Sequence, residues 1–355
     1  GFSGRQLFLG FSFLCLILIV AVFTNLIAGL FAAQPAVATA SLLFIALAPV
    51  FALVTTRFKV RLLHASLVFV PLVYLTVWLG AAYPLDIAAL FGLEGAACKQ
   101  AWLVVLAVYI LVASVTPVQW LLQPRDYLNS WLLYGMLLLG FAAIVVSAPP
   151  IEMDAFKGLQ AVTADGSLTA MIPALFIFIA CGACSGFHAL VASGTTSKQV
   201  ANERDMLPIG YGAMLLEGVL GVMSLVAVMT MAPETFTELG KTPTAAFAAG
   251  ISRLSVSLGC NVEHASIFLS LAISAFMLTS LDTATRLGRF LCQELFLPRM
   301  HQDVDGTDRQ AEQARARLGG VRFLMTNKYI ASLVIVGLSL AMAMSGEAAT
   351  LWPIF

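Results

Sequence analysis

The chain has 355 residues, of which 60% are hydrophobic and only 11% are charged, and its formal net charge is zero. A soluble domain carries about 25% charged residues, so this composition excludes a soluble globular protein and predicts a membrane protein with many spans. The balanced charge also excludes the overall basic field that nucleic-acid binding requires, so no nucleic-acid partner is expected.

Nine apolar runs of roughly twenty residues are long enough to cross a hydrocarbon core as helices. No segment shows strand-like alternation that competes with them, so the pattern predicts an all-α polytopic membrane protein. The eighth run either stops as written or continues as a helix to about Phe296. The expected spans are Leu7–Phe31, Ala36–Thr55, Leu62–Ala82, Trp102–Leu122, Leu128–Ser147, Ile172–Val191, Ile209–Met231, Ala265–Leu281 and Tyr329–Ser345.

These spans place 15 of the 19 basic residues on one side of the membrane and 4 on the other. Short loops that carry the excess of lysine and arginine face the cytoplasm. We therefore expect the N-terminus of this chain to be cytoplasmic and Phe355 to lie outside.

The connections between the spans differ in kind. Ala148–Ala170 and Pro233–Asn261 are expected outside, and Thr244–Ser257 within the latter is either a short interfacial helix or part of a re-entrant pair. Pro298–Asn327 is expected to be a soluble cytoplasmic loop, and Pro124–Tyr127 a tight cytoplasmic turn. Within the spans, hydroxyl and amide side chains predict hydrogen bonds between helices, namely those of Asn25, Thr39 and Ser41.

The stretch Cys181–Thr196 is rich in glycine, alanine, serine and threonine and follows an apolar run. A membrane helix that ends in such residues can open its backbone to a ligand where protein or a water-filled cavity surrounds it. We expect the helix to be interrupted here and to present backbone amides to a solute. The candidate residues on this stretch are Ser185, Gly186, His188, Ser193, Gly194, Thr195 and Thr196.

An ionisable side chain at the centre of a membrane helix costs roughly 2.5–3.5 kcal/mol, so each one within a span is a candidate. Glu217 is either a hydrogen-bonded group that ties two helices together or a proton-carrying, substrate-facing carboxylate. The glycines around it are expected to let another backbone come close. His188 is either a satisfied core histidine or a gate or proton relay.

Four polar residues recur at three- and four-residue steps near the end of the eighth span, which places Thr279, Asp282, Thr283 and Arg286 on one helix face. Asp282 and Arg286 either form a structural ion pair at the helix end or line a gate beside a substrate path.

Cysteine spacing gives no strong site. Cys181 and Cys184 form a C-x-x-C pair, which we assign to packing rather than to zinc or redox chemistry. Cys98 and Cys260 are expected in outside loops, and a bridge between them is left open. No nucleophile, base and metal set converges at readable spacing, so we expect neither an enzyme nor a bound metal or cofactor.

Three blocks resemble the carbon starvation protein (CstA) family: PRDYLNSWLL, CGACSGFHALVASGTTSKQVANERDMLPIGYGAMLLE and TSLDTATRLGRFLCQELF. The resemblance implies a bacterial inner-membrane transporter linked to peptide uptake during carbon starvation, a stress response, or to proton-driven pyruvate uptake. It also implies a fold with inverted repeats and broken helices, as in the amino acid–polyamine–organocation superfamily. Because family members usually continue beyond both ends of this chain, we expect residues 1–355 to be one partial transporter domain.

The resulting expectation is a secondary active transporter that imports small organic nutrients, such as peptides or pyruvate, by symport with H⁺ or Na⁺. Its partners would be the lipid bilayer and that solute. The alternative is a non-transporting membrane subunit or a nutrient-sensing scaffold of a larger complex. The positions of the three blocks that fall within matching motifs include Ser185, Gly186, His188, Ser193, Gly194, Thr195, Thr196, Glu217, Asp282 and Arg286.

Overall fold

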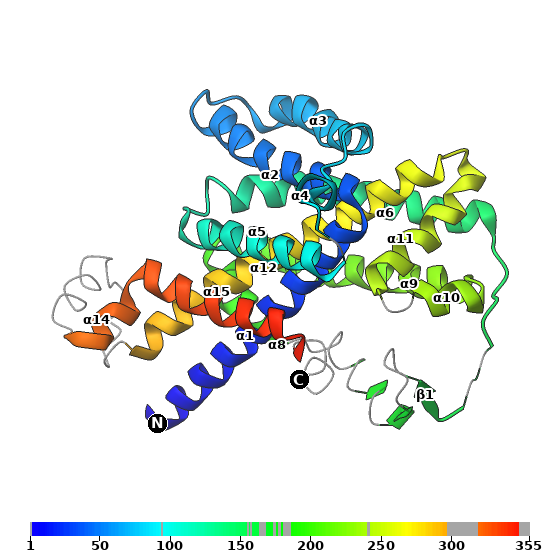
Figure 1. The fold of residues 1–355 in the computed structure, drawn as a ribbon. Coiled ribbons are helices and arrows are strands. Elements are labelled where there is room, and N and C mark those ends of the chain that lie inside the picture. The colour runs from blue at the N-terminus through cyan, green and yellow to red at the C-terminus, as the bar shows by residue number, and fades with distance from the viewer. Residues whose placement is uncertain are drawn as a thin grey trace. The chain divides into compact units, whose positions relative to one another are not determined.

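The computed structural model of the protein describes residues 2–93, 95–154, 156, 158–162, 168–172, 175–176, 179, 186–239, 242–296 and 319–347. Within these ranges, eight helices are long and apolar enough to cross a membrane, so the predicted all-α membrane fold is confirmed (Figure 1). Half of the expected sixth span, Ile172–Val191, lies outside these ranges. The chain divides into two compact units.

The first unit comprises Gly1–Ala28, Ala96–Val118 and Leu278–Phe355. Its helices are α1 (Phe2–Ala33), α5 (Ala96–Val115), α14 (Gly320–Thr326), α15 (Lys328–Ser345) and the C-terminal part of α12 (Val262–Phe296). Small residues let these helices approach closely. A β-carbon on Gly288 of α12 would collide with the side chain of Ile335 on α15. Ser339 of α15 donates a hydrogen bond to the carbonyl of Ile17 on α1 at 3.1 Å, so α1, α12 and α15 pack as one group.

The second unit comprises Gly29–Gly95 and Gln119–Met277. Its helices are α2 (Pro35–Thr56), α3 (Leu62–Ala82), α4 (Ile87–Phe91), α6 (Leu122–Ser147), α8 (Gly186–Gly194), α9 (Ala213–Met229), α10 (Pro233–Leu239), α11 (Pro243–Leu254) and the N-terminal part of α12. α2 and α3 pack side by side in Figure 1. Gly80 permits this, because a β-carbon there would lie 2.5 Å from the carbonyl oxygen of Ala36.

Most predicted spans match the observed helices. α3 occupies Leu62–Ala82 as expected, and α2 and α15 begin one residue early. α12 continues without a break to Phe296, and its 35 residues extend about 52 Å, well beyond the ~30 Å hydrocarbon core. Ser41 forms the expected hydrogen bond between helices, with Ser274 of α12.

The predicted tight turn at Pro124–Tyr127 is wrong. α5 ends at Val115, seven residues before the expected end of that span, and α6 already begins at Leu122. Pro124 therefore lies in the first turn of α6, where a proline is tolerated because the N–H groups have no acceptor within the helix. Arg125 follows it and is fully buried.

The connections contain more structure than the sequence suggested. β1 (Gln160–Val162) and β2 (Leu168–Ala170) pair antiparallel, with Gln160 opposite Ala170. Such short strands cannot show a readable alternation. In the expected outside loop, α10 and α11 are followed by a 3₁₀-helix, η4 (Ser255–Leu258). α11 shows that most of Thr244–Ser257 is helical, and the choice between an interfacial helix and part of a re-entrant pair stays a prediction. Of the expected loop Pro298–Asn327, residues 298–318 lie outside the described ranges and α14 occupies Gly320–Thr326.

Candidate functional site

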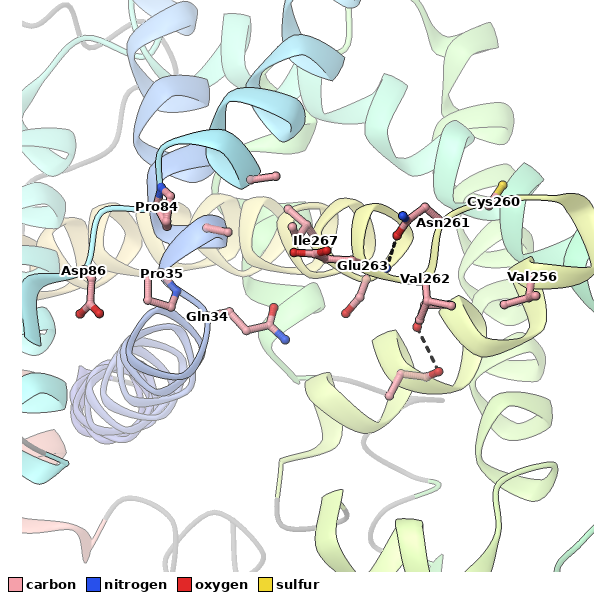
Figure 2. A pocket seen from close by; sticks show the side chains of 15 residues that line it. Gln34, Pro35, Pro84, Asp86, Val256, Cys260, Asn261, Val262, Glu263 and Ile267 are labelled. Carbon is pink, nitrogen blue, oxygen red and sulfur yellow. Dashed lines mark hydrogen bonds between the residues drawn. The ribbon is translucent and has the colours of Figure 1, made fainter. Parts of the chain in front are cut away.

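An open cavity of about 1050 Å³ lies in the second unit, where several helices begin or end (Figure 2). Its walls come from four places: the α1–α2 turn at Gln34–Ala36, the end of α3 with Pro84 and Asp86, the region of α11 and η4, and the start of α12. A cavity of this size can hold a small organic solute.

Hydrogen bonds fix the segments around the cavity. The hydroxyl of Thr39 on α2 donates to the carbonyl of Tyr83 at 3.1 Å and accepts from the backbone N–H of Leu85 at 2.6 Å. These bonds hold the turn that carries Pro84 and Asp86 against α2. Asp86 in turn accepts from the N–H of Ala89 at 3.2 Å and caps α4. The turn after α3 is therefore held at both ends.

Polar side chains enter the cavity from opposite walls. Figure 2 shows Gln34 extending from the α1–α2 turn toward the start of α12, where Asn261 accepts from the N–H of Glu263 at 2.8 Å. Oε1 of Gln34 is buried and has no hydrogen-bond partner within the described ranges. Asp86 and Glu263 are the charged lining residues, and no lysine or arginine joins them among the described residues. The cavity therefore favours a positively charged group.

A second cavity of about 480 Å³ adjoins the first, because Cys260 and Asn261 line both. Its walls are mainly apolar and aromatic, with Tyr74, Trp78 and Phe268. The rings of Tyr74 and Phe268 stack with centroids 5.7 Å apart, and the Tyr74 hydroxyl donates to the carbonyl of Trp131 at 3.2 Å. A polar compartment and an aromatic compartment thus meet at the turn before α12.

The described part of the glycine-rich stretch that the sequence singled out, residues 186–196, lines neither cavity. Ser185, Cys181 and Cys184 lie outside the described ranges. Gly186 is the first described residue of α8, which ends at Gly194. His188 is exposed on this helix.

The chain after α8 is irregular. It passes through two 3₁₀ turns, η1 (Thr196–Lys198) and η2 (Glu203–Asp205), and a π-helical turn, η3 (Pro208–Gly212), before α9. Ser193 and Thr195 donate their hydroxyl hydrogens to the carbonyls four residues earlier, each at 2.9 Å. These hydroxyls are therefore used within the helix itself, and a role for Gly194, Thr195 and Thr196 in solute binding stays a prediction.

Glu217 lies on α9 with an exposed side chain. The expectation that the nearby glycines allow a close backbone approach is wrong for the described residues, since a β-carbon on Gly210, Gly212, Gly218 or Gly221 would meet nothing within 4 Å. The close approach involving α9 occurs instead opposite α11. There, a β-carbon on Gly250 would lie 2.8 Å from the carbonyl oxygen of Ala227.

The third predicted group lies on α12 within the first unit. Thr279 is half-buried, whereas Asp282 and Arg286 are 0% and 5% exposed. Asp282 accepts a hydrogen bond from the hydroxyl of Tyr109 on α5 at 2.8 Å. Arg286 donates to the carbonyls of Ala113 and Thr116, both at 2.7 Å. The structure thus shows what the two charged residues contact, and their function stays a prediction.

Two further residues of α12 extend this group beyond those predicted from the sequence. Arg289 donates to the carbonyl of Ser114 at 2.7 Å, and Gln293 donates to the carbonyl of Thr326 at 2.8 Å. Both continue the face of Asp282 and Arg286 at three- and four-residue steps, a signal that was present in the sequence. Tyr109 gave no such signal, because one tyrosine in an apolar run is ordinary.

The cysteines do not form the bridge that the sequence left open. Cys98 and Cys260 are both free thiols. Cys98 is buried within α5 rather than in a loop, because that helix begins earlier than expected. Among the residues that the structure describes, no three histidine, cysteine, aspartate or glutamate side chains gather as a metal-ligand set.

One protein family matches this chain along its whole length, and individual relatives match parts of it. The profile of the family described as "Carbon starvation protein CstA" matches residues 1–245 and 237–355. The "Peptide transporter CstA" of Campylobacter jejuni is 32% identical over 291 residues, which cover 66% of this chain and 40% of that protein. The protein of the same name from Bacillus subtilis is 33% identical over 228 residues, covering 54% and 38%. No solved structure matches the chain.

A further relative has a different name. The "Pyruvate/proton symporter BtsT" of Escherichia coli is 44% identical over 137 residues, which cover 38% of this chain and 19% of that protein. The chain spans about two fifths of the length of the C. jejuni and B. subtilis proteins. The family profile accounts for every residue from 1 to 355, and the chain therefore belongs to the carbon starvation protein CstA family.

Proposed function

We propose that the protein is a secondary active transporter that imports small peptides across the bacterial inner membrane together with protons. Membership of the CstA family and the names of its relatives support transport. The observation that carries the proposal is the open cavity at the ends of membrane-spanning helices, which two acidic side chains line and an aromatic compartment adjoins.

The charge of the cavity favours a peptide over a short carboxylate such as pyruvate. Asp86 and Glu263 attract the α-amine of a peptide, whereas pyruvate has no cationic group to offset the repulsion of its carboxylate. The adjoining compartment with Tyr74, Trp78 and Phe268 offers apolar surface for a peptide side chain. A small α-keto acid has neither group to place there.

The direction of transport follows from the expected orientation. The α1–α2 turn, the end of α3 and the start of α12 all lie on the side with few basic residues. That side is outside by the positive-inside rule, so the cavity would receive solute from outside the cell. Protons are the proposed coupling ion because one relative is named a proton symporter, and Na⁺ is the competing ion.

Uptake by proteoliposomes tests the proposal. With an imposed pH gradient, we expect a labelled dipeptide to accumulate and pyruvate to accumulate far less. Glu263→Gln should raise the dipeptide concentration for half-maximal uptake roughly fivefold, which is about 1 kcal/mol of binding. Glu234→Gln, an exposed acid on α10 that does not line either cavity, is the matched control and should change nothing.

Other results would contradict it in distinct ways. Stronger uptake of pyruvate than of any dipeptide would refute the peptide assignment. Accumulation that follows a Na⁺ gradient instead of a pH gradient would refute proton coupling. No flux of any solute, with stoichiometric co-purification of another polytopic protein, would favour the subunit alternative.

A further inference from the structure

In the first unit, α5 and α12 run parallel and in register. Tyr109 bonds to Asp282, and one helical turn later the carbonyl of Ala113 accepts from Arg286. The two residues of each pair are 173 positions apart in the sequence, and this equal separation is what two parallel helices in constant register give. Asp282 therefore contacts α5 one helical turn before Arg286 does, inside that helix rather than at its end.

Asp282 is fully buried within a membrane helix. A carboxylate in such a place is costly, and it is a candidate for a proton or ion path. The charged and titratable groups around it are Tyr109 from α5 and Arg286 and Arg289 from α12. α1 contributes Arg5, which pairs with Glu294 at 2.7 Å, and α15 begins with the exposed Lys328.

Arg286 and Arg289 both donate hydrogen bonds to the C-terminal end of α5. The last carbonyls of a helix have no partner within the helix, and cationic side chains satisfy them well. Arg286 donates to two of these carbonyls and Arg289 to a third, all at 2.7 Å. Arginine keeps its charge at any physiological pH. Asp282 is therefore the member of this cluster whose charge can change.

We propose that Asp282 carries the coupling proton and that Tyr109 positions its carboxylate. The proposal rests on the proton-coupled transport proposed above. In this step the carboxylate accepts one proton on one side of the membrane, becomes a neutral carboxylic acid, and returns that proton on the other side. No other bond forms or breaks.

Protonation removes the counter-charge of Arg286. Arg286 and Arg289 then bind the end of α5 beside a neutral Asp282 instead of a charged one. The free energy of the contact between α5 and α12 therefore differs between the two protonation states. The α5–α12 contact thereby acquires two charge states, which is what proton coupling needs. Glu217, which the sequence favoured for this role, is exposed on α9 and lies in the other unit.

Proteoliposomes containing the whole protein separate coupling from transport. Solute counterflow needs no net proton movement, whereas accumulation driven by a pH gradient does. We expect Asp282→Asn to retain counterflow and to lose about 100-fold in the initial rate of pH-driven uptake. Glu217→Gln is the matched control and should retain both activities.

A second variant covers the case in which Asp282→Asn fails to fold. Tyr109→Phe keeps the ring and removes only the hydroxyl that favours the charged carboxylate. The midpoint of the pH profile of driven uptake should move up by about one pH unit. A merely structural tyrosine would lower the rate at every pH without moving that midpoint.

The outcomes are distinct. Full pH-driven uptake by Asp282→Asn, or an unmoved midpoint in Tyr109→Phe, overturns the proposal and leaves the transporter assignment standing. Loss of driven uptake in Glu217→Gln with counterflow retained also overturns it, in favour of Glu217. No uptake of any solute by the unmodified protein overturns the proposed function and this proposal with it.

Discussion

The hydroxyl oxygens of Ser41 on α2 and Ser274 on α12 lie 2.8 Å apart, and both side chains are fully buried. Ser274 also reaches the carbonyl of Leu271 at 2.8 Å. One turn toward the N-terminus of α12, Ser270 is equally buried, yet its hydroxyl has no hydrogen-bond partner among the described residues. Ser270 and Ser274 therefore differ chiefly in whether a side chain from another helix hydrogen-bonds to them.

This difference predicts opposite effects on stability. Ser274→Ala leaves the hydroxyl of Ser41 without its partner and should destabilise the protein, whereas Ser270→Ala should be neutral or stabilising. In a double-mutant cycle, Ser41→Ala and Ser274→Ala should couple by about 0.6 kcal/mol, the average for such bonds in membranes. Thermal unfolding in detergent measures this, and additive effects of the two substitutions would refute the interaction.

Gly80 predicts a packing defect when it is enlarged. A β-carbon at this position would lie 2.5 Å from the carbonyl oxygen of Ala36 and 2.9 Å from the β-carbon of Ala40. Backbone cannot move aside cheaply, so Gly80→Ala should cost about 1–3 kcal/mol of unfolding free energy. Gly221→Ala on α9 meets nothing within 4 Å and should be neutral or slightly stabilising. Equal losses in both variants would show that helix packing at Gly80 is looser than the structure indicates.

Arg286 predicts a requirement for the guanidinium rather than for charge alone. Both bonds to Ala113 and Thr116 come from one guanidinium nitrogen, Nη2, which the shorter side chain of lysine does not place at the same point. Arg286→Lys should therefore lower the unfolding free energy by roughly 1.5–3 kcal/mol, the value for hydrogen bonds to charged groups. Arg5→Lys is the control, because its pair with Glu294 is 38% and 41% exposed and contributes about 0–1 kcal/mol. If Arg286→Lys were as stable as Arg5→Lys, the bonds to the end of α5 would carry little weight.

Cys260 predicts selective chemical labelling. Its thiol lines both cavities and is half-buried, whereas Cys98 is only 5% exposed. In single-cysteine variants on intact cells, a membrane-impermeant maleimide should label Cys260 quickly and Cys98 hardly at all. A transported dipeptide should slow the labelling of Cys260. Labelling that requires broken cells would place the cavity on the cytoplasmic side and reverse the proposed orientation.

The sequence predicted the spans well because their length and hydrophobicity are properties of a single segment. Leu62–Ala82 was recovered to the residue for that reason. The error at Pro124 arose because a proline that ends one helix looks the same as a proline in the first turn of the next. The β1–β2 pair was missed because three residues are too few for a pattern.

The site was harder to predict for a different reason. Gln34, Asp86 and Glu263 come from three separate segments, and each is an unremarkable polar residue at a helix end. Only folding brings them to one cavity. Asp282 and Arg286 were recognised because their spacing is local, whereas Tyr109 was not, since its importance depends on the register of α5 with α12.

Cys260 and Asn261, in the turn before α12, form a wall that the two compartments share. A molecule that occupies both compartments must pass this shared wall. The wall would therefore select solutes by the distance between their polar group and their apolar group. Larger side chains at Cys260 and Asn261 would reduce the volume of both cavities. Smaller side chains would join the two cavities into one, which would bind solutes less selectively.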